Sequence, residues 1–315
     1  MERGLLQAGR RPVSDEFTLS AGGYTAIVTA RAAALRVLQF EGRDLIVSFP
    51  QGGPIPDYRG VLAAPWPNRI ADGTYSFDGL SHQVPVNEPE RETALHGLAF
   101  PLDWTLKESD AGSLTMTCTV GPTAGYPFAL ELTARFALDS DGLHTTVKGR
   151  NAADVAAPYG VCPHPYLVAG PSPLDEWILE FAADSFLEVT PDRLLPVGLA
   201  DVAGHNFDFR SPRSIGSTEI DHAFTGLTFD GGLARLSVRD PAGTGVGMSG
   251  VGMSWDQSCQ WLQIHTADKP APIPSRIGLA VEPMTCPPDA FNSGTDLIRL
   301  EPGAEHTASW SIYAL

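Results

Sequence analysis

One acid and one histidine, far apart in the chain, each stand in rigid, apolar surroundings. Glu282 ends the apolar run Ile277–Val281 in "RIGLAVEPMTCPPDAF" and is followed at once by Pro283. Acidic side chains are almost never fully buried unless they are paired, so an acid in this place is informative. Desolvation would raise the pKa of Glu282 and suit it to general acid or base catalysis, whereas a salt bridge with Arg276 would lower that pKa. The sequence leaves both alternatives open, and Pro283 is expected to end the strand so that the acid lies at the rim of a cleft.

The histidine is His164, which lies between two prolines in "VCPHPYL". Prolines fix the backbone, and this favours one orientation of the imidazole. A carboxylate and an imidazole are both side chains that can transfer protons in general acid–base catalysis. Metal binding through Cys162 and His164 lacks further partners at ligand spacing, so no metal is predicted.

Four more polar residues are candidates for binding a ligand. Asn68 and Arg69 follow two prolines in "APWPNRI", His96 lies in "ETALHGLAF", and Asp221 lies in "EIDHAF". Each also has a structural interpretation. The "PNR" segment could be a turn with Arg69 paired to a surface acid, His96 a hydrogen-bonded core histidine, and Asp221 a turn or capping residue.

Strands must position these residues. Short alternating or β-branched apolar runs such as "YTAIVTA", "RDLIVSF", "SLTMTCTV", "QWLQIHT" and "ASWSIYAL" recur along the chain and end at turn residues. The segment "FALELTARFALDSDGLHTTVKGRN" predicts a β-hairpin at Asp-Ser-Asp-Gly. Amphipathic helices are scarce, while 32 glycines and 27 prolines suit many turns. We therefore predict an all-β protein, a large antiparallel β-sandwich that forms a single domain over residues 1–315.

Charge and composition limit the partners. The formal net charge of −16 argues against binding to nucleic acid or to an anionic membrane and favours a small ligand. The start of the chain, "MERGLLQAGRRPVSDEF", has no long apolar stretch, and we expect a cytoplasmic protein. The four cysteines are far apart and predict free, buried thiols. The tandem repeat "GVGMSGVGMS" is interpreted as a local duplication, and the oligomeric state is left open.

Taken together, the polar segments resemble the aldose 1-epimerase (galactose mutarotase) family. The resemblance runs from about residue 60 to residue 294. It rests on P-x-P-N-R-I, then H-G, then His-x-Tyr, then Asp-x-x-Phe, and finally Glu-Pro with P-D-A downstream. It implies a β-sandwich whose concave face holds a monosaccharide, and cofactor-free interconversion of α and β anomers. It also implies that Glu282 is the general base and His164 the general acid, so Glu282 should be ionised and His164 protonated in the resting site. The other residues are implied to bind the sugar, namely Asn68, Arg69, His96 and Asp221.

The sequence departs from the galactose-type pattern at two places. Many such members have Thr-Asn before the histidine and Tyr-Phe-Asn-Leu after it, where this chain has "VCPHPYLV"; they also have Gln after Glu-Pro, where this chain has Met284. These departures argue against galactose as the preferred sugar. The segments "HPYL" and "EPMTCPPDAF" are similar to a bacterial subgroup that includes sulfoquinovose mutarotases, which implies a sugar with an anionic substituent at C6.

Two other functions compete with this one. A sugar-binding protein of the same fold would not need an acid–base pair, so the presence of both Glu282 and His164 argues against it. A glycoside hydrolase or lyase would use two carboxylates flanking the bond, with Asp221 as the second acid. The predicted function is therefore that of an aldose 1-epimerase.

Overall fold

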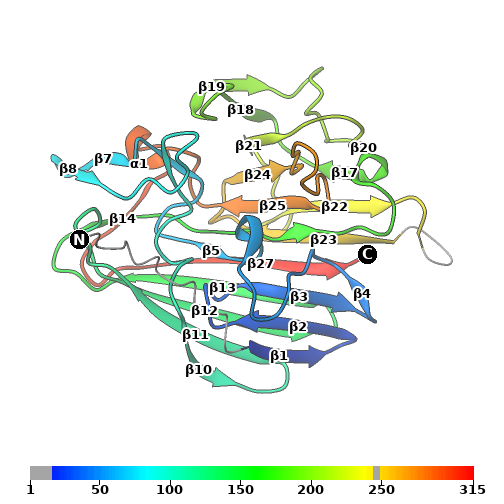
Figure 1. Cartoon of the computed structure of the whole chain (residues 1–315), viewed down its shortest axis with the longest axis horizontal. Helices are drawn as coiled ribbons and strands as arrows, with labels where there is room; N and C mark the ends of the chain where they lie inside the picture. Colours follow the sequence, from blue (N-terminus) through cyan, green and yellow to red (C-terminus); the bar gives the residue numbers. More distant parts are fainter. Residues whose placement is uncertain (1–15, 244–248) are drawn as a thin grey trace, which may run out of the picture.

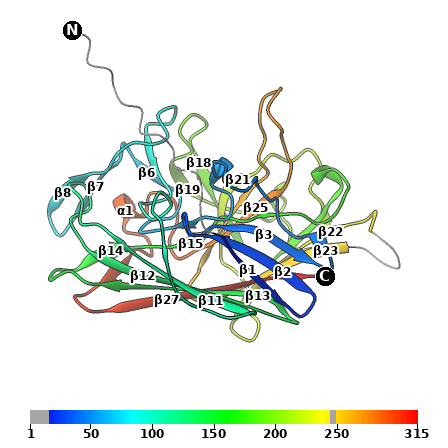
Figure 2. The same ribbon diagram turned by 60° about the horizontal axis from the view of Figure 1, so that its bottom comes forward.

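The structure is a computed structural model that describes residues 16–243 and 249–315. It is nearly all β, as predicted, and its strands pair antiparallel throughout the two large sheets. Figures 1 and 2 show the long strands β11, β12, β13 and β27 lying side by side as one broad layer. The second large sheet and several short strand pairs lie over one face of that layer.

The strands group into sheets as follows. The nine-stranded sheet has the order β10 (Thr105–Ser109), β11 (Ser113–Val120), β12 (Leu130–Asp139), β13 (Gly142–Asn151), β27 (Glu305–Ala314), β23 (Ser249–Asp256), β22 (Leu233–Asp240), β17 (Ile178–Phe181) and β20 (Arg213–Ser214). The six-stranded sheet has the order β16 (Tyr166–Leu167), β25 (Leu279–Met284), β24 (Trp261–His265), β21 (Asp221–Thr225), β18 (Ser185–Val189) and β19 (Pro196–Asp201). A four-stranded sheet comprises β1 (Glu16–Ala21), β2 (Tyr24–Thr29), β3 (Leu35–Phe40) and β4 (Arg43–Asp44).

Short pairs and helical turns complete the fold. The pairs are β5 (Leu62–Ala63) with β15 (Cys162–Pro163), β6 (Arg69–Ala71) with β9 (Thr93–Leu95), β7 (Thr74–Phe77) with β8 (Leu80–Gln83), and β14 (Ala157–Tyr159) with β26 (Ile298–Leu300). The helical elements are α1 (Ala290–Ser293) and the 3₁₀ turns η1 (Pro56–Tyr58) and η2 (Leu174–Glu176). In the two described segments no helix is long and apolar enough to span a membrane.

Alternation along the strands builds the core. In β12, buried residues alternate with exposed or half-buried ones over all ten positions, which is the pattern of a strand with one face against the core. The predicted hairpin is confirmed: β12 and β13 are joined at Asp139 and Gly142 by a two-residue turn. Apolar side chains from both large sheets contribute to one large buried cluster that runs from Leu19 to Ile312. This core supports the strands that carry the polar candidates.

Some details differ from the expectations. The run "RDLIVSF" forms only the two-residue strand β4, because its chain then leaves the sheet after Asp44. The second "GVGMS" copy lies inside β23, where Gly252 leaves room for the Tyr313 ring, and most of the first copy lies outside the described residues. The start of the chain also lies outside them. All four cysteines are free, and only Cys118 is not fully buried.

Candidate functional site

The register of the six-stranded sheet gathers polar side chains on one face. Glu282 on β25 stands opposite Gln263 on β24, and His265, two residues further along β24, stands opposite Asp221 on β21. Because side chains two residues apart in a strand share a face, these four side chains point to the same side of the sheet. Glu282 lies inside its strand and is only 2% exposed.

The expectation that Pro283 ends the strand is therefore wrong. Pro283 pairs with Leu262, and Met284 pairs with Trp261, so β25 continues past the acid. Proline has no backbone N–H, so it fits in a strand only at a position where the ladder needs no donor. As a result Glu282 lies in the floor of the site rather than at its rim.

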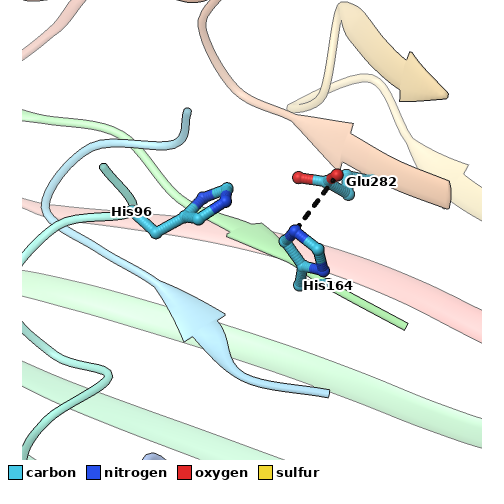
Figure 3. A group of neighbouring side chains, drawn as sticks. All are labelled: His96, His164 and Glu282. Carbon is cyan, nitrogen blue, oxygen red and sulfur yellow. Dashed lines mark ion pairs between the residues drawn. The ribbon is translucent and has the colours of Figure 1, made fainter. Parts of the chain in front are cut away.

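His164 reaches Glu282 through the same sheet. Tyr166 of β16 pairs with Ala280 of β25, and continuing that antiparallel register by two residues brings His164 opposite Glu282. The N–H of Val281 donates to the carbonyl of Pro165 at 3.1 Å, which holds the two segments together. The His164 Nε2 atom lies 3.4 Å from the Glu282 Oε1 atom, as Figure 3 shows. The two groups implied to be acid and base are thus cross-strand neighbours.

A second small ladder carries Asn68, Arg69 and His96. Arg69 pairs with Leu95, and the N–H of His96 donates to the carbonyl of Asn68 at 2.8 Å, which continues the β6–β9 register. Asn68 and His96 both have positive φ values, of 52° and 59°. Non-glycine residues rarely adopt this conformation, and it turns both side chains out of the regular ladder. Figure 3 shows the His96 ring directed toward His164 and Glu282.

Arg69 is held by an acid that the sequence reading did not single out. Its Nε and Nη2 atoms donate to the two carboxylate oxygens of Glu88 at 2.7 and 2.9 Å, a bidentate pair. Its Nη1 atom donates to Asn68 Oδ1 at 3.3 Å. The acid that pairs with Arg69 is therefore a half-buried residue of the site, and it fixes the direction of the guanidinium.

Aromatic rings form the walls around the histidines. The Tyr58 ring lies 4.8 Å from the His96 ring, and the Tyr166 ring lies 5.5 Å from the His164 ring, measured between centroids. The two imidazole rings meet edge to face at 4.7 Å. Asp57 and Tyr58 both have positive φ values, of 50° and 55°. Such strained backbone is often found at binding sites, where the surrounding structure maintains it.

These residues line one open cavity of about 280 Å³. All six predicted site residues contribute to it, so the structure brings the whole predicted set together. Sequence reasoning missed several other lining residues, which are Asp57, Tyr58, Glu88, Arg91, Gln263, His265, Asp268 and Lys269. The polar residues at positions 263 and 265 of the apolar strand "QWLQIHT" are a signal that could have identified one face of β24.

Asp221 is oriented by its neighbours on the sheet. The Gln263 Nε2 atom donates to Asp221 Oδ1 at 2.7 Å, and the His265 Nδ1 atom lies 3.7 Å from Asp221 Oδ2. Arg276, by contrast, pairs with Asp175 and Asp268 at 2.7 Å each. The alternative in which Arg276 forms a salt bridge with Glu282 is therefore excluded.

Burial shifts both members of the central pair toward their neutral forms. Loss of solvation raises the pKa of Glu282 well above its usual range; Asp221 adds to this effect, and Arg69 opposes it. Burial, with His265 as a lesser cause, lowers the pKa of His164 to about 4. Burial also lowers the pKa of His96 well below its ordinary value. The expected resting state, with Glu282 ionised and His164 protonated, is thus not the one that the buried surroundings favour.

Comparisons with known proteins agree with the geometry. A family model described as aldose 1-epimerase matches residues 15–313. The Escherichia coli protein YihR, described as uncharacterised, is 35% identical over 298 residues, which are 94% of this chain and 92% of that protein. Human galactose mutarotase is 29% identical over 206 residues, which are 62% of this chain and 59% of that protein.

A solved structure also shares this fold. The structure of an aldose epimerase homologue from C. elegans superposes with a TM-score of 0.81 at 18% identity, covering 96% of this chain and 99% of that one. This likeness shows the fold alone, whereas the family match covers nearly the whole chain. The chain therefore belongs to the aldose 1-epimerase family, and it is an isomerase of the epimerase class.

Proposed function

We propose that this protein interconverts the α and β anomers of an aldose by opening and reclosing the sugar ring. The observation that carries the proposal is the pair His164 and Glu282, 3.4 Å apart in the floor of a cavity that a monosaccharide can enter. The family match supports the same chemistry. A site that only binds sugar has no need for a buried acid–base pair.

The reaction needs two proton transfers around one acetal carbon. Glu282 takes the proton of the anomeric hydroxyl while His164 gives a proton to the ring oxygen, so that the C1–O5 bond breaks and an aldehyde forms. Rotation about C1–C2 exposes the other carbonyl face. Reclosure reverses both transfers and returns each proton to its donor. Each positioned proton transfer contributes roughly 10²- to 10⁴-fold to the rate.

One proton on the pair is enough for this cycle. The neutral pair and the ion pair of Glu282 and His164 hold the same number of protons and differ only in which residue carries the proton. The buried surroundings favour the neutral pair in the free site. A bound sugar would add hydrogen bonds to the carboxylate, and Arg69 already lowers its pKa, so both act toward the ion pair that starts the reaction.

The remaining cavity residues have binding roles in this proposal. Arg69, fixed by Glu88, offers guanidinium donors to the oxygens at the anomeric centre. His96 and Asn68 face the sugar from the β6–β9 ladder, and Asp221 accepts hydrogen bonds from sugar hydroxyls. Arg69 and Asn68 are buried and hydrogen-bonded to each other, and polar groups held in place in this way fix the orientation of a small polar ligand.

The charges of the cavity bear on the substrate. Three cations line it, and each is already paired with an acid: Arg69 and Arg91 with Glu88, and Lys269 with Asp57 at 2.5 Å. Five acids line the same cavity, so its charge does not by itself favour an anion. A sugar with an anionic C6 substituent would have to meet Lys269 or Arg91, which are more exposed than Arg69. Both neutral and anionic aldoses therefore belong in the test.

Polarimetry tests the proposal. Freshly dissolved α-glucose and α-galactose are mixed with the protein, and the approach to the equilibrium rotation is followed at a pH where spontaneous mutarotation is slow. The proposal expects a rate proportional to the protein concentration. A sugar-binding protein would leave the rate at its spontaneous value, and a hydrolase would instead release reducing sugar from an oligosaccharide.

A further inference from the structure

We propose that His96, His164 and Glu282 form a binding site for a transition-metal dication, of which Zn²⁺ is the best match. Each residue offers one ligand atom, and these atoms all lie within 4.8 Å of one another. The three side chains are 4%, 5% and 2% exposed. Two imidazoles and one carboxylate are a donor set that zinc uses in proteins, with a fourth position left for water or another ligand.

The spacing of the ligand atoms is close to what zinc requires. With zinc–ligand bonds of about 2.0 to 2.2 Å, two ligand atoms of a tetrahedral site lie about 3.4 Å apart. His164 Nε2 and Glu282 Oε1 are already separated by 3.4 Å. Since no ligand pair exceeds 4.8 Å, the remaining approach is at most about 1.4 Å and needs only side-chain rotation.

The backbone that carries the ligands is held in place from several directions. The N–H of His96 donates to the carbonyl of Asn68 at 2.8 Å, and the carbonyl of His164 accepts from the N–H of Gly60 at 2.8 Å. Glu282 lies within the paired strand β25. A framework fixed in this way loses little conformational entropy when an ion binds.

The hydrogen bonding of the two imidazoles is incomplete. Within the described residues, the Nδ1 atoms of His96 and His164 are buried and have no hydrogen-bond partner. Buried polar atoms normally have a partner, so each unsatisfied atom needs an explanation. In Figure 3 both rings are directed into the space shared with Glu282. The Nε2 atom is the nitrogen of His164 that faces Glu282, so it is the ligand atom of this ring. The buried Nδ1 atom is then left for the second hydrogen bond that metal-bound histidines make.

The local charge also suits a cation. Glu282 supplies a negative ligand, and Asp221 adds a second acid on the same face of the sheet. Arg69, a cation that lines the same cavity, is held by both carboxylate oxygens of Glu88. Imidazole ligands favour Zn²⁺, Cu²⁺ and Ni²⁺ over Mg²⁺ and Ca²⁺, which prefer oxygen ligands only. The site should therefore discriminate between these two groups of ions.

The consequence for activity is inhibition. A metal bound here occupies the lone pairs with which Glu282 and His164 exchange protons, so the ion and the sugar compete. The binding part of this inference is independent of the proposed function, whereas the inhibition rests on it. Metal binding is therefore measured directly, and the two ideas can fail separately.

The test begins with calorimetric titration of the chelator-treated full chain with Zn²⁺, and with Mg²⁺ in parallel. We expect one zinc equivalent and no binding of Mg²⁺. His96→Asn, His164→Asn and Glu282→Gln should each weaken zinc binding more than tenfold, because each removes one of three ligands. Far-UV circular dichroism checks that each variant is folded, and any one folded variant suffices for the comparison.

His144→Asn is the matched control. This histidine lies on β13, 40% exposed, with its Nε2 atom 3.0 Å from Asp139 Oδ1, so it is an imidazole beside a carboxylate outside the cavity. Its replacement should leave zinc affinity unchanged. Absence of zinc binding, equal affinity in wild type and folded His96→Asn, or loss of binding in His144→Asn would overturn the site. Zinc binding that leaves anomer exchange unaffected would overturn the inhibitory role.

Discussion

Replacement of Glu282 by Gln separates the proton-transfer role of this residue from its part in the fold. Gln keeps the size and shape of the side chain but cannot take a proton from the anomeric hydroxyl. We expect mutarotation to fall by roughly 10²- to 10⁴-fold while the protein remains folded. Polarimetry on a freshly dissolved α-aldose measures this rate. A rate close to that of the wild type would show that another group is the base.

The same variant reports the protonation state of the acid. Folding raises the pKa of Glu282 above its ordinary value of 4.5. Between pH 4.5 and the pKa of the folded state, the native protein therefore holds a proton that the unfolded chain has lost. The stability contributed by this proton is fully present below pH 4.5 and is lost as the pH rises through the folded pKa. Gln does not titrate. The free energy of unfolding of Glu282→Gln, relative to wild type, should therefore increase by up to about 1.4 kcal/mol for each pH unit between pH 4.5 and the folded pKa of Glu282.

Urea unfolding at a series of pH values from 5 to about 8 measures this difference. Glu305→Gln is the control, because Glu305 is 44% exposed and pairs with Lys148 only at the surface. The free energy of unfolding of Glu305→Gln, relative to wild type, should stay nearly constant with pH. If the difference for Glu282→Gln is flat or decreases with pH, Glu282 is ionised in the native state, and the neutral resting pair is refuted.

Three further predictions follow from the same geometry. The pH profile of kcat/KM should be bell-shaped. Activity falls toward acid as His164, with a pKa of about 4, takes up a second proton on the pair, and it falls toward alkali as Glu282 loses the single proton that the active pair holds. A single limb near pH 6.5 would contradict the buried pair. Gln263→Leu removes the 2.7 Å hydrogen bond to Asp221, so KM for the aldose should rise more than kcat falls; an unchanged KM would exclude Asp221 from sugar binding. Gly97 has a φ of 75°, and in Gly97→Ala the added Cβ atom would collide with the backbone carbonyl oxygen of Ala64. The thermal unfolding midpoint measured by calorimetry should therefore fall by several degrees, and an unaltered midpoint would show that alanine is tolerated at this turn without strain.

Much of the fold could be predicted from local patterns. Strands such as β11 and β12 alternate along their whole length, and the turn between β12 and β13 has the Asp-Gly step typical of tight hairpins. Those signals depend only on neighbouring residues. The order of strands within the sheets was not predictable, because pairing of β13 with β27 joins segments more than 150 residues apart.

The sequence allowed us to predict which residues gather in the cavity, but not their electrostatics. All six predicted residues line one cavity, and each lies in a motif on which the resemblance to the family rests. The contact of His164 with Glu282 follows from the register of β16 and β25, which no local pattern reveals. The partner of Arg69 proved to be Glu88, and the strand did not end at Pro283. Such pairings depend on which distant strands meet, so the sequence could not settle the protonation of the pair.

Exchange spectroscopy at equilibrium tests the central claim most directly. Magnetisation transfer between the anomeric protons of the α and β forms is measured by NMR for glucose, galactose, xylose and sulfoquinovose, with the wild-type protein and with His164→Asn. We predict protein-dependent exchange for at least one of these aldoses, reduced by roughly 10²- to 10⁴-fold in His164→Asn. Spontaneous exchange rates for every aldose with the wild-type protein, or full exchange with His164→Asn, would contradict the assignment of this pair as the catalytic acid and base.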